Sequence, residues 1–329
     1  MKKRIIDLRD ATPLLDIVSY GRGGRSLTPA QQHHISLTVR RVPEVMVKVS
    51  GGARTLAGVE RHMAYIGREG KLGLEDDLGS RLDGKGFERN LIEDWDLDIE
   101  ALKRQTERSI RGGRKPPKLV HNIIFSMPPG TPPQKVLNAV RKLAHNEWQF
   151  KHRYAMTLHT DDHHPHVHVV VKAVSEGGER LNIRKATLRN WRRQFAANLR
   201  ELGIAANATE RAVRGETKTH KSDGIFRAAE RNSSTHMHER KQQMLRELAQ
   251  RTLATDEGSA RVKATRMEVV DGWRRVAAQL ATSGDRDLVT RIHSFVAGMP
   301  PPQTDKELMI DQLRSSVRKW NIDPPHRSR

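Results

Sequence analysis

Runs of alternating or continuous apolar residues predict four β-strands between residues 45 and 173. The segment "EVMVKVSGG" alternates over residues 45–50 and ends in two glycines, as a strand does before a turn. Residues 119–126 ("LVHNIIFS") have the pattern of a buried strand, and prolines follow it. Residues 153–159 ("RYAMTLH") and 166–173 ("HVHVVVKA") complete the set.

A helical period appears after the first strand and recurs through the rest of the chain. Thr55 suits an N-cap and Gly70 suits a stop, and the apolar stripe between them consists of Leu56, Val59, Met63 and Ile66. Further helices are predicted at 94–104, 134–146, 186–202, 265–281 and 285–297, with polar helix from about 228 and a polar, Pro-containing tail at the end.

Residues 1–42 mix basic, glycine and polar residues without sustained periodicity, so we expect a flexible basic arm there. The whole chain has 59 Lys and Arg against 39 Asp and Glu, a net charge of +20. Such an excess favours a polyanionic partner, with nucleic acid first and an anionic membrane second. No segment approaches the roughly 20 apolar residues of a membrane span, so we expect a cytoplasmic protein without membrane insertion.

The histidine-rich stretch "HTDDHHPHVHVVV" suggests a metal site. The chain has no cysteine, so any metal must be held by His, Asp or Glu. On a strand, His166 and His168 point to one face while valines fill the other. His159 ends the preceding strand, and a hairpin would bring its ring beside them. Three neutral imidazoles with open positions form a catalytic type of site.

Two plainer interpretations of this stretch are a histidine-rich surface strand and an adventitious nickel binder. The His-x-His-x-Asp-His pattern of metallo-β-lactamases is absent, as is the zincin pattern His-Glu-x-x-His. Asp161 is the preferred acceptor for a ring N–H of a ligating histidine. His164 is also expected to lie beside the ligands without binding the metal itself.

A metal beside a basic surface points to phosphodiester chemistry, which needs an attacking group. The chain has three tyrosines, and Tyr65 lies about 140° from the centre of its helix's apolar stripe, facing away from the core. Arg61 and Arg68 share its face, and positive charge favours the ionised phenol. The alternative is an ordinary basic, solvent-facing helix with an exposed tyrosine.

Three segments together resemble the motifs of relaxases, the HUH-type endonucleases of plasmid mobilisation. These are "HMAYIGREGKLGLEDD", "HNIIFSMPPGT" and "LHTDDHHPHVHVVVKA", in the family's order, and the branch that includes the agrobacterial T-DNA border nickase is the most similar. The resemblance extends over about residues 44–216. It implies an α+β fold whose central antiparallel sheet, usually five-stranded, carries the metal site; the strand pattern leaves one strand of five unplaced.

The resemblance also implies residue roles. Tyr65 is the nucleophile, and His159, His166 and His168 are the metal ligands, with Mg²⁺ or Mn²⁺ the expected ion. Relatives often have a histidine where Asn122 stands and an acidic residue where His163 stands, so His121 or Asp161 is expected to compensate. The domains expected are an arm at 1–42, a relaxase domain at 43–216 and a helical accessory region at 217–329.

We therefore expect a DNA relaxase that cleaves one strand at a transfer origin, forms a 5′-phosphotyrosine link and later rejoins the strand. DNA contacts are expected from a set of basic and hydroxyl residues: Arg61, Arg68, Lys71, Ser126, Arg189, Arg192 and Arg193. Trp191 is either a base-stacking residue or part of the core. Accessory mobilisation proteins and a coupling protein or secretion apparatus are the expected partners, in a bacterial cytoplasm.

Two other functions fit the same residues. One is a replication initiator or transposase that uses the same chemistry. The other is a metal-stabilised DNA-binding protein that does not cut. Covalent attachment of DNA to the protein distinguishes the cleaving enzymes from the protein that only binds.

Overall fold

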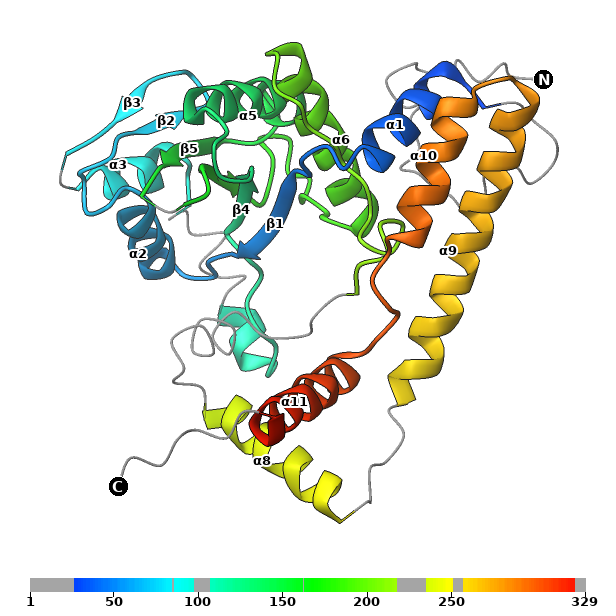
Figure 1. The fold of residues 1–329 in the computed structure, drawn as a ribbon. Helices are drawn as coiled ribbons and strands as arrows, with labels where there is room; N and C mark the ends of the chain where they lie inside the picture. Colours follow the sequence, from blue (N-terminus) through cyan, green and yellow to red (C-terminus); the bar gives the residue numbers. More distant parts are fainter. Residues whose placement is uncertain are drawn as a thin grey trace, which may run out of the picture. The chain divides into compact units, whose positions relative to one another are not determined.

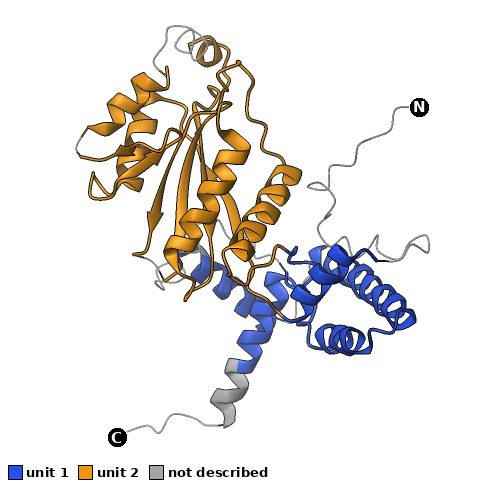
Figure 2. Ribbon diagram, turned by 90° about the horizontal axis from the view of Figure 1, so that it is seen from above, with its two compact units in different colours: residues 1–40, 209–329 blue, residues 41–208 orange. Residues whose placement is uncertain are grey.

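The structure, a computed structural model, describes residues 27–84, 86–97, 107–161, 163–217, 235–250 and 257–322 (Figure 1). It divides into two compact units (Figure 2). The first, called the sheet unit here, comprises residues 41–208. The second, called the helical unit, combines residues 1–40 with residues 209–329.

The sheet unit is built on one antiparallel sheet of six strands in the order β1-β4-β6-β5-β2-β3. The strands are β1 (Met46–Gly51), β2 (Leu74–Asp76), β3 (Arg81–Leu82), β4 (Val120–Ser126), β5 (Tyr154–His159) and β6 (His166–Lys172). The four strands predicted from the pattern are confirmed, and β2 and β3 raise the expected count of about five to six. With three and two residues, these strands are too short to show an alternating pattern.

Helices cover both faces of this sheet. Helices α5 (Pro133–Trp148) and α6 (Lys185–Glu201) pack on one face, over a core that includes Val167, Val169 and Val171 of β6. Helices α2 (Leu56–Ile66) and α3 (Phe87–Asp94) pack over Val170 on the other. Because side chains alternate along a strand, His166 and His168 share the face of Val170, under α2 and α3. This is an α+β fold.

Helix α2 begins as predicted and ends earlier than predicted. The hydroxyl of Thr55 accepts a hydrogen bond from the backbone N–H of Gly58, which confirms the N-cap. The helix stops at Ile66 instead of continuing to Gly70. Arg68 and Glu69, at φ of 51° and 54°, and Gly70 at 82° then turn the chain in the left-handed region. Arg68 is therefore not on the helix, and its side chain is aimed by the turn.

The other helices predicted in the sheet unit agree with the structure to different degrees. Helix α3 ends at Asp94, where a helix over 94–104 was predicted to begin, and residues 98–106 lie outside the described residues. Helices α5 and α6 match the predictions at 134–146 and 186–202 within two residues at each end.

The helical unit contains α1 (Pro29–Val39), α8 (Thr235–Ala249), α9 (Glu257–Thr282), α10 (Arg286–Ala297) and α11 (Asp305–Ile322). Helix α1 occupies part of the segment predicted as a flexible arm. It is capped by Thr28 and Gln31, and Ile35 is fully buried in a core with Trp273 and Ile292. Helix α11 occupies part of the segment predicted as a polar tail, and residues 323–329 lie outside the described residues. Residues 1–26, which carry the rest of the predicted arm, lie outside the described residues.

Candidate active site

Three histidine rings meet where β5 ends and β6 begins. In the antiparallel register His159 lies opposite His166, and His168 follows two residues later on the same face. The ring centroids of His159 lie 5.2 Å from His166 and 4.5 Å from His168. One nitrogen of each ring lies within 4.8 Å of the other two. His159 and His168 are buried and His166 is half-buried. The predicted convergence of the three rings is confirmed.

Backbone carbonyls fix the orientation of two of these rings. Nε2 of His159 donates to the carbonyl oxygen of Ile66 on α2 at 2.7 Å, which leaves Nδ1 with its lone pair. Nδ1 of His166 donates to the carbonyl oxygen of His164 at 2.9 Å, which leaves Nε2 with its lone pair. A metal-binding histidine usually donates its other ring N–H to a neighbouring acceptor, which fixes the ring, and these two carbonyls are such acceptors. The sequence analysis predicted Asp161 as the acceptor. A backbone carbonyl such as that of Ile66 cannot be recognised as an acceptor from the sequence.

The chemistry of the donor set fits a metal ion. Burial lowers the pKa of His159 and lowers that of His168 to about 3, with the neighbouring imidazoles adding to the shift of His168. These rings are therefore neutral near pH 7, the form that binds a metal. Buried Nδ1 of His168 has no hydrogen-bond partner among the described residues. Burying a polar atom without a hydrogen-bond partner costs free energy of folding. A cation bound by this ring would give one of its nitrogens a partner.

Tyr65 reaches this site from α2. Val59, Met63 and Ile66 face the core, while the side chain of Tyr65 is 51% exposed, on the side predicted from the apolar stripe. Its ring lies edge-on to that of His168, with 6.5 Å between centroids. Helix packing thus places an accessible phenol next to the histidine cluster, although the two are about a hundred residues apart in sequence.

The side chain of Arg68 links Tyr65 to the cluster. Its guanidinium carbon lies 5.4 Å from the centroid of the Tyr65 ring. Nη2 donates to Nδ1 of His159 at 3.2 Å and also pairs with the carboxylate of Asp161. Asp161 itself lies 3.9 Å from Nδ1 of His159, beyond hydrogen-bond range. Asp161 therefore contacts the cluster through Arg68.

His62 is a neighbour of Tyr65 that the sequence reasoning did not single out. It lies three residues before Tyr65 on α2, and the two rings stack with 6.4 Å between centroids and 28° between planes. Burial lowers the pKa of His62 to about 4, and its Nε2 has no partner among the described residues. Because residues three apart on a helix are neighbours, the spacing of His62 and Tyr65 could have predicted this contact.

Three other residues expected to contact DNA, Ser126, Lys71 and Arg61, differ in exposure and in hydrogen bonding. Ser126 is directly opposite His166 in the register, but it is buried, and its hydroxyl donates to the carbonyl of Met127. Lys71 is exposed on the turn after α2. Nε of Arg61 donates to the carbonyl of Ala57 in its own helix.

Several expected site residues lie on the opposite face of the sheet. His121 pairs with Val171 in the register and shares its face, so it is not a neighbour of the three histidines. Arg189, Arg192 and Arg193 belong to α6, which covers that same face. Trp191 is fully buried and its indole N–H donates to Glu147, so it belongs to the core. Strand alternation and helix packing separate these residues from Tyr65.

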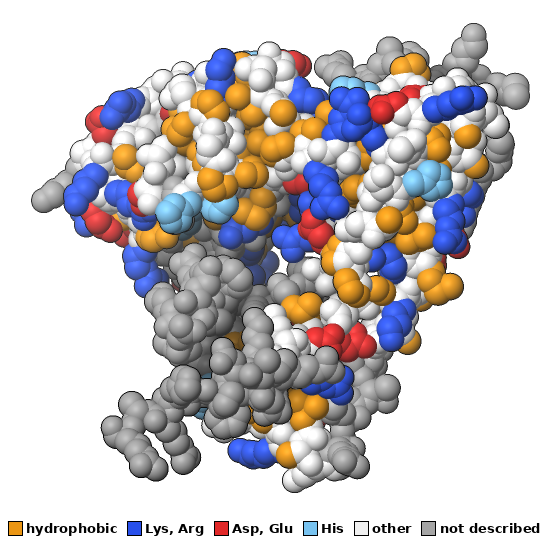
Figure 3. Space-filling model, viewed as in Figure 1, with side chains coloured by type: hydrophobic (Ala, Val, Ile, Leu, Met, Phe, Trp, Pro, Cys, Tyr) orange, Lys and Arg blue, Asp and Glu red, His pale blue; other side chains and the backbone are white. Residues whose placement is uncertain are grey.

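Basic side chains are dispersed over the described surface that Figure 3 draws, mixed with acidic and apolar ones within each unit. The positive charge inferred from composition is therefore not gathered in one patch on this face. None of the described helices is long and apolar enough to cross a membrane.

Comparison with known proteins bears directly on this site. The family model "Relaxase: MobA/VirD2-like, nuclease domain" matches residues 65–204, a range that begins at Tyr65 and contains the three histidines. The T-DNA border endonuclease VirD2 of Rhizobium radiobacter is 27% identical over 187 residues. This segment is a relaxase nuclease domain of the VirD2-like branch.

The similarity to VirD2 is partial. The aligned residues cover 52% of this chain and 43% of VirD2, so the chain spans less than half the length of that relative. No solved structure matches the chain. The match to the relaxase model places this domain in the general class of nucleases that act on DNA. The three histidines form a site that could hold a metal ion.

Proposed function

We propose that the relaxase domain nicks one strand of DNA with Tyr65 as the nucleophile. One observation carries the proposal: an exposed tyrosine ring lies 6.5 Å from His168, within a cluster of three histidine rings. Tyr154 is buried in the core, so among the described tyrosines Tyr65 alone is accessible to a polymer such as DNA.

The reaction is a transesterification. The phenol oxygen of Tyr65 loses its proton and forms a bond to the phosphorus of one phosphodiester. The bond from phosphorus to the 3′ oxygen breaks, and that oxygen takes up a proton to become a free 3′-OH. The phosphate, and with it the 5′ end of the downstream fragment, stays attached to Tyr65. Since one phosphodiester replaces another, the reverse reaction rejoins the strand without ATP.

The neighbouring residues have separate parts in this proposal. His159, His166 and His168 would hold a divalent ion, Mg²⁺ or Mn²⁺, and binding at Nδ1 of His159 would replace the hydrogen bond from Arg68. When bound, such an ion supplies Lewis-acid stabilisation of charge on the phosphate. Arg68 lies between the Tyr65 ring and His159, where its guanidinium favours the ionised phenol and meets the incoming phosphate. His62, stacked against the Tyr65 ring, restricts the orientation of that ring.

The biological setting follows from the family and from the relative that acts on T-DNA borders. We place the reaction at the transfer origin of a mobilisable or integrative element in the bacterial cytoplasm. Accessory mobilisation proteins and a coupling protein or secretion apparatus are the proposed partners. Residues 43–216 are the proposed limits of the nuclease domain, and residues 217–329 the accessory region.

The test uses single-stranded origin DNA from the sequence that flanks the gene, with Mn²⁺. Oligonucleotide labelled at its 3′ end should give a covalent protein–DNA band. Oligonucleotide labelled at its 5′ end should give a shorter product that a polymerase can extend, because its 3′-OH is free. Tyr65→Phe should abolish both products, since it removes only the attacking oxygen.

Tyr154→Phe is the matched control, because it removes one hydroxyl from a tyrosine buried in the core. This variant should still form the covalent band. Tight DNA binding by the unsubstituted protein without any such band, over a range of origin oligonucleotides, would reject the proposal in favour of a protein that binds without cutting.

A further inference from the structure

A cleft lined mainly by basic side chains lies in the helical unit, outside the residues that match the relaxase model. It has a volume of about 650 Å³ and is lined by α8, α9, the start of α11 and residues 211–217. Five cationic side chains face it against two acidic ones. The cationic residues are Arg211, Arg240, Arg261, Arg266 and Lys306, and the acidic residues are Glu216 and Asp305.

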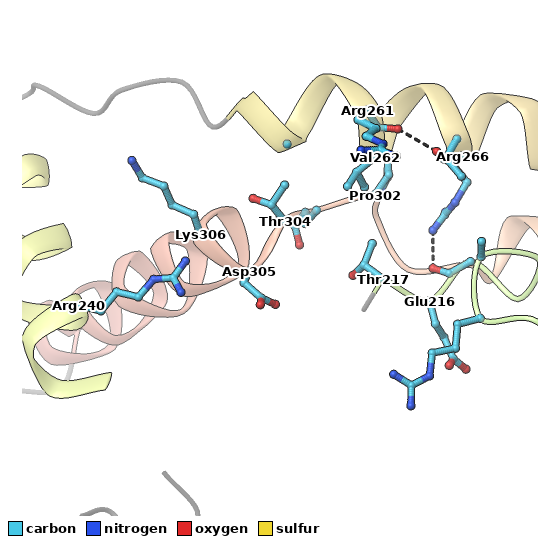
Figure 4. A pocket seen from close by; sticks show the side chains of 16 residues that line it. Glu216, Thr217, Arg240, Arg261, Val262, Arg266, Pro302, Thr304, Asp305 and Lys306 are labelled. Carbon is cyan, nitrogen blue, oxygen red and sulfur yellow. Dashed lines mark hydrogen bonds between the residues drawn. The ribbon is translucent and has the colours of Figure 1, made fainter. Parts of the chain in front are cut away.

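Two of the cationic side chains have structural partners. Arg266 donates to the carbonyl oxygens of Pro300 and Gly215, so it ties two loops of the wall together. The ammonium group of Lys306 lies 3.2 Å from the carboxylate of Glu247. Figure 4 shows Arg266 reaching from α9 toward the segment of Glu216, and Lys306 on α11. These groups shape the cleft.

The guanidinium groups of Arg211, Arg240 and Arg261 have no ion-pair or hydrogen-bond partner among the residues that the structure describes. Arg240 and Arg261 come from different helices, α8 and α9, and open onto the same cleft (Figure 4). Glu216 is engaged by Arg214 at 3.0 Å. The cleft therefore keeps positive charge that internal carboxylates do not neutralise.

We infer that this cleft binds the phosphodiester backbone of single-stranded DNA, as a contact separate from the nuclease site. Guanidinium groups match phosphate oxygens with paired N–H donors, and Thr217 adds a hydroxyl group to the lining. Val262 and Pro302 add apolar surface on which a sugar or base can lie. The inference rests on the proposed action of the sheet unit on DNA.

The test compares two double variants of the full chain. Arg240→Gln with Arg261→Gln removes two unneutralised charges from the cleft. Arg246→Gln with Arg274→Gln removes two exposed charges from the same two helices outside the cleft, and is the matched control. Binding of a labelled oligothymidylate is measured by fluorescence anisotropy over a series of salt concentrations.

The cleft variant should bind the oligothymidylate on the order of tenfold more weakly near 0.1 M salt. Its plot of log affinity against log salt should be shallower by about 1.4, because each lost contact to a single strand accounts for about 0.7. The control variant should keep the slope of the unsubstituted protein, since exposed charges away from the DNA are screened.

Equal slopes for the two variants would overturn the inference. So would binding of polyglutamate, in place of DNA, that depends on Arg240 and Arg261, because the cleft would then take an acidic protein. The inference would also fail if thymidine monophosphate competed as well as oligothymidylate at equal phosphate concentration. The cleft would then be a site for a free nucleotide.

The covalent assay separates this inference from the proposed function. The cleft variant should still form the Tyr65 adduct at saturating DNA, because both arginines lie outside residues 65–204. An adduct with unchanged salt slopes defeats only the inference about the cleft. A changed slope with no adduct from the unsubstituted protein defeats only the nicking proposal.

Discussion

At the scale of single residues, the site depends on imidazoles whose rings are oriented by backbone carbonyls. His166 shows this arrangement: Nδ1 donates to the carbonyl of His164, so Nε2 is left to accept. The ring of His164 has no part in that hydrogen bond. The roles of the two neighbouring histidines can therefore be separated by substitution.

His166→Ala should lower the rate of DNA nicking by about 100-fold or more while most DNA binding is retained. Loss of a ligand forfeits the several kcal/mol that a Lewis acid provides, whereas backbone contacts supply much of the affinity. Nicking is measured by gel assay in Mn²⁺, and binding by anisotropy.

His164→Ala is the control for this ligand, because the alanine keeps the carbonyl that orients His166. Nicking by His164→Ala should be close to that of the unsubstituted protein. A normal, metal-dependent rate in His166→Ala would mean that His166 is not a ligand.

At the scale of elements, α2 brings the tyrosine, β5 brings His159, and β6 brings His166 and His168. Val59, Met63 and Ile66 bury one side of α2, so the Tyr65 side is exposed next to the cluster. The Ile66 carbonyl at the end of α2 also holds the His159 ring. Burial depresses the pKa of His62 on α2 and of His168 on β6, so each of the two elements brings a neutral imidazole to the site.

Acid should therefore loosen the contact between α2 and the sheet in metal-free protein. Burial depresses the pKa of His62 to about 4, below its unfolded value of about 6.5, so between these values the unfolded chain binds more protons. The free energy of unfolding should fall as pH falls from about 6.5 toward 4, and His62→Gln should reduce that fall.

This pH dependence is measured by urea denaturation in the presence of a chelator. His145→Gln, which changes an exposed histidine of α5, should leave the slope against pH unaltered. Identical slopes for His62→Gln and the unsubstituted protein would show that His62 is not buried as a neutral ring.

At the scale of the whole molecule, the helical unit is assembled from both ends of the chain. Ile35 of α1 is fully buried in the same core as Trp273 of α9 and Ile292 of α10. The hydroxyl of Thr38 lies 2.9 Å from that of Thr209, and Nε2 of His34 lies 3.2 Å from the same oxygen. An N-terminal helix is thus part of the unit that follows the nuclease domain in sequence.

Ile35→Ala should destabilise the helical unit by about 2–5 kcal/mol, and Ile35→Val by about 0.5–1.5 kcal/mol, because a cavity opens in a packed core. Hydrogen exchange resolved by peptide localises the effect. Protection should fall in α9 and α10 and remain unchanged in α5, which belongs to the core of the sheet unit. Equal loss in α5 would show that the two units do not unfold separately.

Local sequence patterns were enough to predict the four longer strands, the start of α2, the outward side of Tyr65 and the His-x-His pair on one face of a strand. Each depends on a local period or a capping residue, which neighbouring residues are sufficient to set. Tertiary structure decided which of the candidates meet. It brought His62, Arg68 and the Ile66 carbonyl to the cluster and placed His121 and the α6 arginines on the other face.

Contacts between segments distant in sequence explain that division. The end of α2 at Ile66, the left-handed turn that aims Arg68, and the two short strands β2 and β3 have weak local patterns. Helix α1 likewise has a fully buried Ile35 that carries no signal without its partners in α9 and α10. Burial against those partners, not local propensity, stabilises these features, so only the folded chain specifies them.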